Sequence, residues 1–139
     1  MTSSSTAAET PATSWVLDAS ALLALLLREP GAERVRQVIA GGASMSSVNV
    51  SEVVARLMDL DYSREEVDAS FQGLRIDIIE FDVAQARDAG YLRPLTRSRG
   101  LSLGDRACLA VARRLGLPAL TADRNWAGLD AGVEVVICR

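Results

Sequence analysis

The sequence contains no histidine and no lysine, so all 15 of its basic residues are arginines. Without histidine, the chain cannot build a Ser-His-Asp or Cys-His hydrolytic centre or a histidine-ligated zinc site. Without lysine, it lacks both the lysine of a P-loop and the amine of a Schiff base. If the protein is an enzyme, carboxylates combined with a hard cation are its most accessible chemistry.

Cysteine is scarce, and long apolar runs are missing. The two cysteines, Cys108 and Cys138, are too few and too far apart for a disulfide framework or a zinc cluster, and each lies in an apolar run. We therefore expect reduced thiols and a cytoplasmic protein. No apolar stretch is long enough to span a bilayer, so we expect no membrane association.

The length and composition predict one folded domain. The chain has 139 residues, of which 49% are hydrophobic and 24% charged, a balance that excludes a disordered chain. Residues 1–13 are rich in Ser, Thr and Ala and lack the basic start and apolar core of a signal peptide. We expect a flexible leader at 1–13 and a single domain at 14–139.

Short apolar runs alternate with helical patterns along the chain. Strands are expected at 14–18, 43–47, 75–81, 117–121 and 133–138, and helices at 19–27, 32–40, 48–60, 63–74, 82–93 and 101–116. This alternation predicts an α/β protein, a three-layer α/β/α sandwich around a mostly parallel sheet of four to five strands. Ligands of such sheets collect at the carboxyl ends of the strands.

Four acids fall near that predicted edge, and each has an ordinary structural explanation. Asp18 ends the first strand and is suited to cap the next helix. Glu52 points away from the apolar face of its helix, where Arg56 is a possible ion-pair partner. Asp105 occupies the acidic position of a capping box, and Asp123 suits a turn. Asp105 also lies on the apolar side of its helix, where an unpaired carboxylate is costly.

Taken together, the four acids predict a metal site. Parallel topology brings the ends of their strands and the starts of their helices to one edge of the sheet. Two carboxylates about 5 Å apart repel by about 3 kcal/mol at an effective dielectric near 20, so a cluster of them needs a cation. Oxygen ligands with retained water favour Mg²⁺ or Mn²⁺ over zinc.

The chain resembles the PIN domain family, and closely the VapC-type toxins of bacterial toxin–antitoxin pairs. The resemblance is carried by VLDASALLALL, VSEVVARL, GLSLGDRACLAVARRLGLPALTADRNW and VEVVICR, and it extends from about residue 15 to the end. It implies a PIN-like fold with catalytic, metal-binding acids at Asp18, Glu52, Asp105 and Asp123. It also implies that Ser20 and Thr121 support the metal shell.

The activity implied by the resemblance is metal-dependent hydrolysis of RNA phosphodiester bonds. Mg²⁺ or Mn²⁺ would activate water, so no protein nucleophile is required. The net charge of −3 is unfavourable for RNA, but a metal offsets the local acids. Four arginines near the third acid are candidates to contact phosphates, with ordinary solvated surface as the alternative: Arg93, Arg97, Arg99 and Arg106.

The first helix is apolar around nearly its whole circumference, which predicts a partner surface. The resemblance implies a homodimer and a cognate VapB-like antitoxin that lies against this helix. The expected antitoxin contacts are Leu22, Leu23, Leu26 and Leu27, and the alternative is that the following helix buries this face.

Two other functions are consistent with part of the pattern. A catalytically inactive PIN-like module would bind RNA or protein without cutting, although all four acids are present. A phosphatase with an acid after its first strand would need a second acid where Ser20 stands, and a receiver domain would need a lysine.

Overall fold

The computed structural model describes residues 14–139, and the predicted leader at residues 1–13 lies outside this part of the chain. Within the described residues, five strands form a single sheet in the order β3-β2-β1-β4-β5, and every pairing is parallel. The strands are β1 (Trp15–Leu17), β2 (Ala43–Ser46), β3 (Ile76–Ile79), β4 (Ala119–Thr121) and β5 (Val135–Ile137). The predicted parallel sheet is confirmed.

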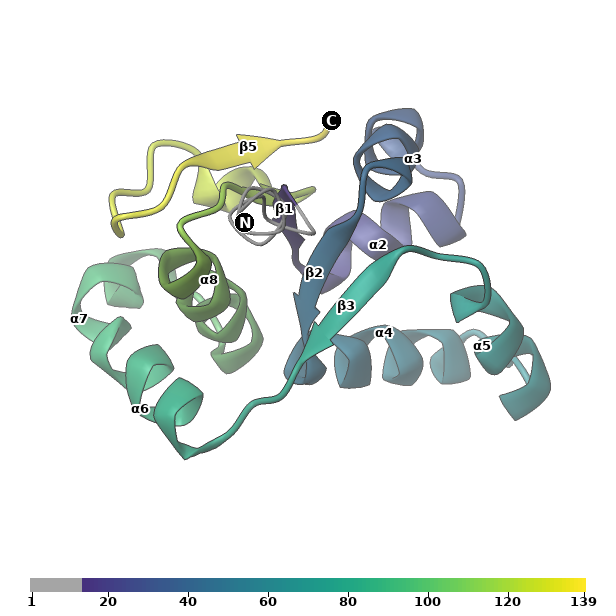
Figure 1. The fold of residues 1–139 in the computed structure, drawn as a ribbon, viewed down its shortest axis with the longest axis horizontal. Coiled ribbons are helices and arrows are strands. Elements are labelled where there is room, and N and C mark those ends of the chain that lie inside the picture. Colours follow the sequence, from purple (N-terminus) through teal and green to yellow (C-terminus); the bar gives the residue numbers. More distant parts are fainter. Residues whose placement is uncertain (1–13) are drawn as a thin grey trace, which may run out of the picture.

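Helices cover both faces of this sheet. The α-helices are α2 (Ala19–Leu26), α3 (Ala32–Ala40), α4 (Ser47–Asp59), α5 (Arg64–Phe71), α6 (Val83–Tyr91), α7 (Arg93–Thr96) and α8 (Leu103–Leu115). Two 3₁₀ turns are η1 (Arg97–Arg99) and η2 (Arg124–Trp126). In Figure 1, α6 to α8 lie to the left of β1, β2 and β3, whereas α2 to α5 lie to the right of these strands or below them. The predicted three-layer α/β/α sandwich is confirmed.

Alternating side chains of the central strands fill two separate cores. Val16 of β1 packs in a core with Leu109 of α8, whereas the next residue, Leu17, packs in the opposite core with Leu22 of α2. A sheet buried on both faces needs apolar residues at successive strand positions. This requirement explains why the strands read as continuous apolar runs.

Helix boundaries follow local signals in the sequence. Ser46 and Ser63 cap α4 and α5 with their hydroxyls, and Gly116 ends α8 in the left-handed conformation with φ 66°. The expected helix at 82–93 stops at Tyr91, and Pro94 lies in the first turn of the separate helix α7. Proline is tolerated there because the first-turn N–H groups have no helical partner.

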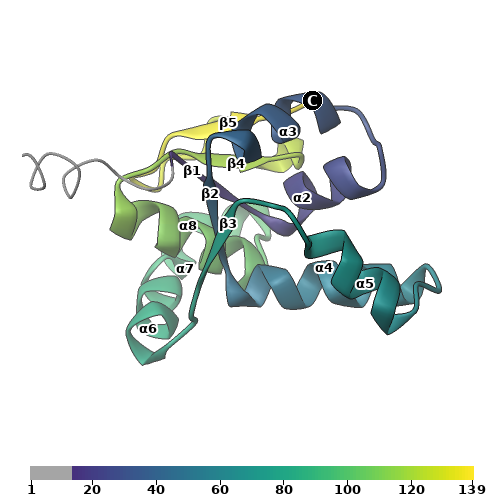
Figure 2. The same cartoon turned by 45° about the vertical axis from the view of Figure 1, so that its right-hand side comes forward.

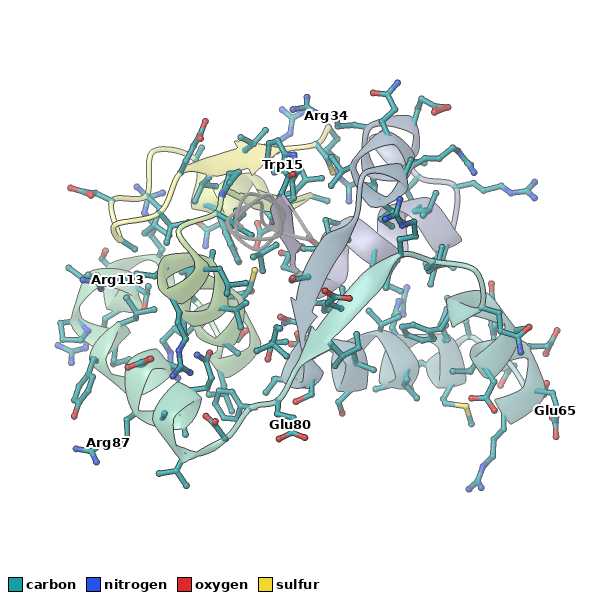
Figure 3. All side chains as sticks on the ribbon, in the orientation of Figure 1. Trp15, Arg34, Glu65, Glu80, Arg87 and Arg113 are labelled. Carbon is teal, nitrogen blue, oxygen red and sulfur yellow. The ribbon has the colours of Figure 1, made fainter. Side chains whose placement is uncertain are left out.

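The topology creates one functional edge. β1, β2 and β4 run parallel, so their carboxyl ends lie on the same side of the molecule, where α4 and α8 begin. In Figure 2, α4 extends past this edge with α5 beside its far end. At the opposite edge, Arg34 lies over the Trp15 ring, 5.6 Å from its centroid (Figure 3). In residues 14–139, no helix is both long and apolar enough to cross a membrane.

Candidate active site

A pocket at the carboxyl edge of the sheet brings the four predicted acids together. Its cavity of about 260 Å³ is lined by Asp18, Ala19, Ser20, Leu23, Glu52, Asp105 and Asp123. The acids come from the end of β1, the N-terminal halves of α4 and α8, and the end of β4. They converge as their sequence positions predict, while their catalytic role stays a prediction.

Asp18 is the most enclosed of the four acids, with 3% of its surface exposed. Its Oδ1 accepts the backbone N–H of Ala21 at 2.8 Å, which caps α2. The Ser20 hydroxyl donates from 2.8 and 2.9 Å to the two carboxylate oxygens, and the Thr121 hydroxyl donates to Oδ2 at 2.5 Å. The two hydroxyl residues that the resemblance places around the metal therefore hold this carboxylate in one orientation.

The same hydroxyls fix the backbone that follows β4. The N–H of Ala122 donates to Ser20 Oγ at 2.9 Å, and the N–H of Asp123 donates to Thr121 Oγ1 at 3.0 Å. Each hydroxyl thus donates to Asp18 and accepts from the backbone, as a hydroxyl group can. The position of Asp123 is therefore coupled to that of Asp18.

Burial raises the pKa of the Asp18 carboxyl from its ordinary 3.8 to about 6. Hydrogen bonds from Thr121, Ala21 and Ser20 lower this pKa, and the negative charge of Asp105 raises it further. Burial has the largest effect because the ionised carboxylate loses water. A cation in the pocket would stabilise the ionised form that the protein alone disfavours.

Thr121→Val is expected to raise the pKa of Asp18 further. The substitution keeps the shape of the side chain but removes the hydrogen bond that lowers this pKa most. A bond to a charged group is worth ~1.5 to 3 kcal/mol, so the Asp18 titration should move upward by roughly one to two pH units. Carboxyl NMR titration of the metal-free chain measures it.

Thr96→Val is a matched control for this titration. Thr96 is also fully buried, but its hydroxyl donates to the helix carbonyl of Leu92 at 3.0 Å, away from the pocket. The control should leave the Asp18 titration unchanged. An unshifted Asp18 titration in Thr121→Val would contradict the assigned role of this hydroxyl.

Glu52 is held by a residue that the sequence analysis did not single out. Asn49 is 1% exposed, and its Nδ2 donates to Glu52 Oε1 at 2.8 Å and to the Gly104 carbonyl at 3.0 Å. In residues 14–139, no ion pair joins Glu52 to Arg56, the alternative that the helical spacing suggested. The sequence held one signal for this hydrogen bond: an asparagine in the first turn of a helix, three residues before the glutamate.

Asp105 and Asp123 also serve as local caps. Asp105 Oδ2 accepts the Ser102 N–H at 2.8 Å, completing the predicted capping box, and Asp123 Oδ1 accepts the Asn125 N–H at 2.9 Å. Burial raises the pKa of Asp105 above its ordinary value, Ser102 lowers it, and Asp123 raises it. Asp105 therefore feels the negative charge of Asp123 across the pocket.

The family of the chain follows from a comparison with protein-family models. The model for the PIN domain matches residues 15–132, which is most of the chain. The chain belongs to the PIN domain family. A comparison with curated proteins finds no match.

Solved structures resemble this PIN domain over nearly its whole length. A toxin–antitoxin complex from Klebsiella pneumoniae has a TM-score of 0.69 and 21% identity, covering 91% of this chain and 98% of that chain. VapC20 of Mycobacterium tuberculosis, a toxin that cleaves the sarcin–ricin loop, has a TM-score of 0.66 and 17% identity. The similarity covers 87% of this chain and 99% of VapC20. VapBC-5 of the same organism, a member of the VapBC family, has a TM-score of 0.56 and 25% identity. The similarity covers 93% of this chain and 99% of that chain. These similarities establish the PIN-like fold.

The acids of this PIN domain fit a hydrated hard cation. Within residues 14–139, the two ion pairs join Arg36 to Glu33 and Arg139 to Glu29, so no arginine is paired with a pocket acid. In the same part of the chain, no three acidic or thiol side chains lie close enough to hold one ion. Mg²⁺ usually keeps several waters and binds through one or two carboxylates. A metal ion in this pocket would therefore need waters to complete its ligands, and the metal site stays a prediction.

The cysteine nearest the pocket of this PIN domain is not a nucleophile. Both cysteines are free, as predicted, and Cys108 is fully buried. Burial raises the pKa of the Cys108 thiol well above its ordinary value, and the charges of Asp18, Asp105 and Glu52 raise it further. The thiol stays protonated at neutral pH, and only the thiolate is nucleophilic.

The four arginines predicted to contact RNA divide into two groups. Arg99 Nη1 donates to two carbonyl oxygens of the loop after β4, at 3.0 and 2.6 Å, and Arg106 Nη1 donates to the carbonyl of Ala89 at 3.1 Å. Arg93 and Arg97 are exposed. Arg99 and Arg106 thus each use one guanidinium nitrogen internally, and phosphate contacts of the four arginines stay a prediction.

The predicted antitoxin surface on α2 needs one correction. Leu22 is 0% exposed and belongs to the core beneath α2, so the prediction is wrong for this residue. Leu23, Leu26 and Leu27 are half-buried, and Leu23 also lines the acidic pocket. A partner on α2 would therefore contact the last three leucines, beside the acids.

Proposed function

We propose that this PIN domain is a Mg²⁺- or Mn²⁺-dependent endoribonuclease toxin. One observation carries the proposal: carboxylates from four separate segments line one pocket, without an arginine in an ion pair with any of them in the described residues. Acids gathered without a protein cation favour a bound metal. Membership of the PIN domain family supports nuclease chemistry.

In this proposal, Asp18, Asp105 and Asp123 hold the metal, directly or through waters. When bound, the metal activates water and neutralises charge on the phosphate. Ser20 and Thr121 orient the Asp18 carboxylate by donating to its oxygens. Asn49 donates to Oε1 of Glu52, and we assign Oε2 to hold the metal through a water and to accept a proton from the attacking water. Water then forms the new bond to phosphorus while the bridging P–O bond of the RNA breaks, and the leaving oxygen takes up a proton from solvent.

The proposed partners follow from the similar structures and from α2. The Klebsiella pneumoniae structure is a toxin–antitoxin complex, and VapBC-5 belongs to a toxin–antitoxin family. We propose a cognate VapB-like antitoxin on the half-buried leucines of α2, where it would cover the pocket, and also a homodimer of the chain. We also propose a cytoplasmic location, where a toxin of this kind would meet RNA.

RNA cleavage by the purified chain is expected to require a divalent metal. Chelation with EDTA should lower the rate by at least about a hundredfold, because the metal supplies several kcal/mol of transition-state stabilisation. Added Mn²⁺ or Mg²⁺ should restore it. Gel analysis of a labelled RNA measures the rate, and an Asp105→Asn preparation purified in parallel controls for contaminating nuclease.

Two results would contradict this function. Cleavage that persists in EDTA would exclude the metal-dependent reaction. RNA or protein binding without cleavage in any divalent metal would favour the alternative of an inactive PIN-like binding module.

A further inference from the structure

Asn49 links the two helices that carry Glu52 and Asp105. It lies in the first turn of α4 and is 1% exposed. Its Nδ2 donates to Glu52 Oε1 at 2.8 Å and to the Gly104 carbonyl oxygen of α8 at 3.0 Å. A side-chain amide has two donor hydrogens, so both are used. One buried side chain thus connects a pocket carboxylate to the backbone of α8.

These contacts fix the orientation of the Asn49 amide. The opposite orientation would place Oδ1 against two acceptors, the Glu52 carboxylate and the Gly104 carbonyl. In the orientation present, Oδ1 is buried and has no hydrogen-bond partner in residues 14–139. A buried unpaired carbonyl oxygen disfavours folding, so an apolar side chain would serve stability better. The two donated hydrogen bonds account for an amide at this position.

Gly104 provides the space that the Glu52 carboxylate occupies. A Cβ at Gly104 would overlap the carboxyl group of Glu52. Gly104 lies within α8 and is not among the residues with positive φ, so the contact rather than the backbone conformation requires glycine. The N-terminal end of a helix also favours a negative charge. The start of α8 is therefore shaped to receive this carboxylate.

We propose that Asn49 is a positioning residue that holds the Glu52 carboxylate against Gly104, where it faces the pocket with Asp18 and Asp105. This inference rests on the proposed function, which assigns Glu52 to the metal-dependent step. Glu52 is exposed, so without Asn49 its carboxylate would turn among several rotamers in water. Residues that orient metal ligands typically change metal affinity or activity by about 10- to 100-fold.

Asn49→Leu tests the proposal because leucine has a similar size but no donor. The Mn²⁺ affinity, measured by calorimetry, and kcat should each fall about tenfold, while KM for RNA changes less than about twofold. Since Asn49 acts through Glu52, adding Asn49→Leu to Glu52→Gln should cause no further loss. Gln85→Leu is the matched control: Gln85 is 1% exposed, both its amide atoms lack partners, and it does not line the pocket.

Gly104→Ala gives a second test that does not depend on the folding of Asn49→Leu. Alanine is favoured over glycine in a helix, but its methyl group would displace the Glu52 carboxylate. The variant should show the same loss of Mn²⁺ affinity as Asn49→Leu. In a Glu52→Ala chain, where the space is vacated, Gly104→Ala should have no effect.

The outcomes separate this inference from the proposed function. Unchanged Mn²⁺ affinity and kcat in Asn49→Leu or Gly104→Ala would overturn the inference and leave the nuclease function intact. A further loss from Asn49→Leu in the Glu52→Gln chain would also overturn it. A wild-type chain that binds Mn²⁺ but does not cut RNA would overturn the proposed function, and the Mn²⁺ affinities of the same variants would then decide the role of Asn49.

Discussion

Asp18→Asn is expected to lower the rate of RNA cleavage by about a thousandfold. The substitution preserves size but removes the negative charge from the most enclosed carboxylate of the pocket. A loss of ~4 kcal/mol in transition-state stabilisation corresponds to this factor, since each ~1.4 kcal/mol is tenfold. Cleavage assays measure the rate. Induced expression should cause growth arrest and discrete new RNA 5′ ends for the wild type only.

The matched control for this variant is Asp82→Asn. Asp82 also caps a helix, α6, by accepting the N–H of Gln85 at 2.9 Å, but it does not line the acidic pocket. Its substitution should leave cleavage and toxicity unchanged. Equal toxicity of Asp18→Asn and the wild type would contradict a catalytic role for Asp18.

The metal-free chain is expected to gain stability as the pH falls from 7 toward 4. The folded chain binds a proton at Asp18 with a pKa of about 6, whereas an ordinary carboxyl has 3.8, so protonation favours the folded state. The loss of folding stability from burying the ionised Asp18 carboxylate is fully present above pH 6. This loss disappears as the pH falls below 6 and the carboxylate takes up its proton. A difference of about two pKa units corresponds to up to ~3 kcal/mol from this residue. Urea unfolding in EDTA at several pH values measures the effect.

Asp18→Asn separates this effect from that of other acids. The variant has no charge to bury, and the hydroxyls of Ser20 and Thr121 can rotate to accept from its amide. It should therefore be more stable than the metal-free wild type at pH 7, by up to ~3 kcal/mol, and should lose most of the pH dependence. Identical pH profiles for the two chains would contradict the assigned burial cost. A stabilised but inactive variant is typical of a site that trades stability for function.

The layers of the fold could be predicted because burial leaves a strong periodic signal. β1 and β4 place adjacent residues, such as Val16 and Leu17, in opposite cores, so each strand reads as one apolar run between helices. Element ends were less predictable because they depend on local contacts. The strand expected at 75–81 extends only over Ile76–Ile79.

The convergence of the acids could also be predicted, because parallel topology alone places Asp18 and Asp123 at one edge. The alternative explanation as caps is also correct, since Asp18, Asp105 and Asp123 all accept backbone N–H groups. A cap fixes the orientation of a carboxylate, so capping and lining the pocket support each other. For these acids the two explanations were never exclusive.

Contacts between distant segments could not be predicted from the sequence. The role of Asn49 depends on the approach of Gly104, 55 positions away. The orientations of the Arg99 and Arg106 side chains likewise depend on hydrogen bonds to backbone carbonyl groups of other segments. Periodicity reports which face of a helix is buried but not which partner a polar side chain meets.

The position of Mn²⁺ in crystals tests the metal site most directly. Crystals of the chain soaked in Mn²⁺ should show an anomalous difference peak inside the cavity lined by Asp18, Glu52, Asp105 and Asp123. The same peak should be lost in Asp18→Asn crystals. A pocket without a peak, at an Mn²⁺ concentration that saturates RNA cleavage, would contradict the account.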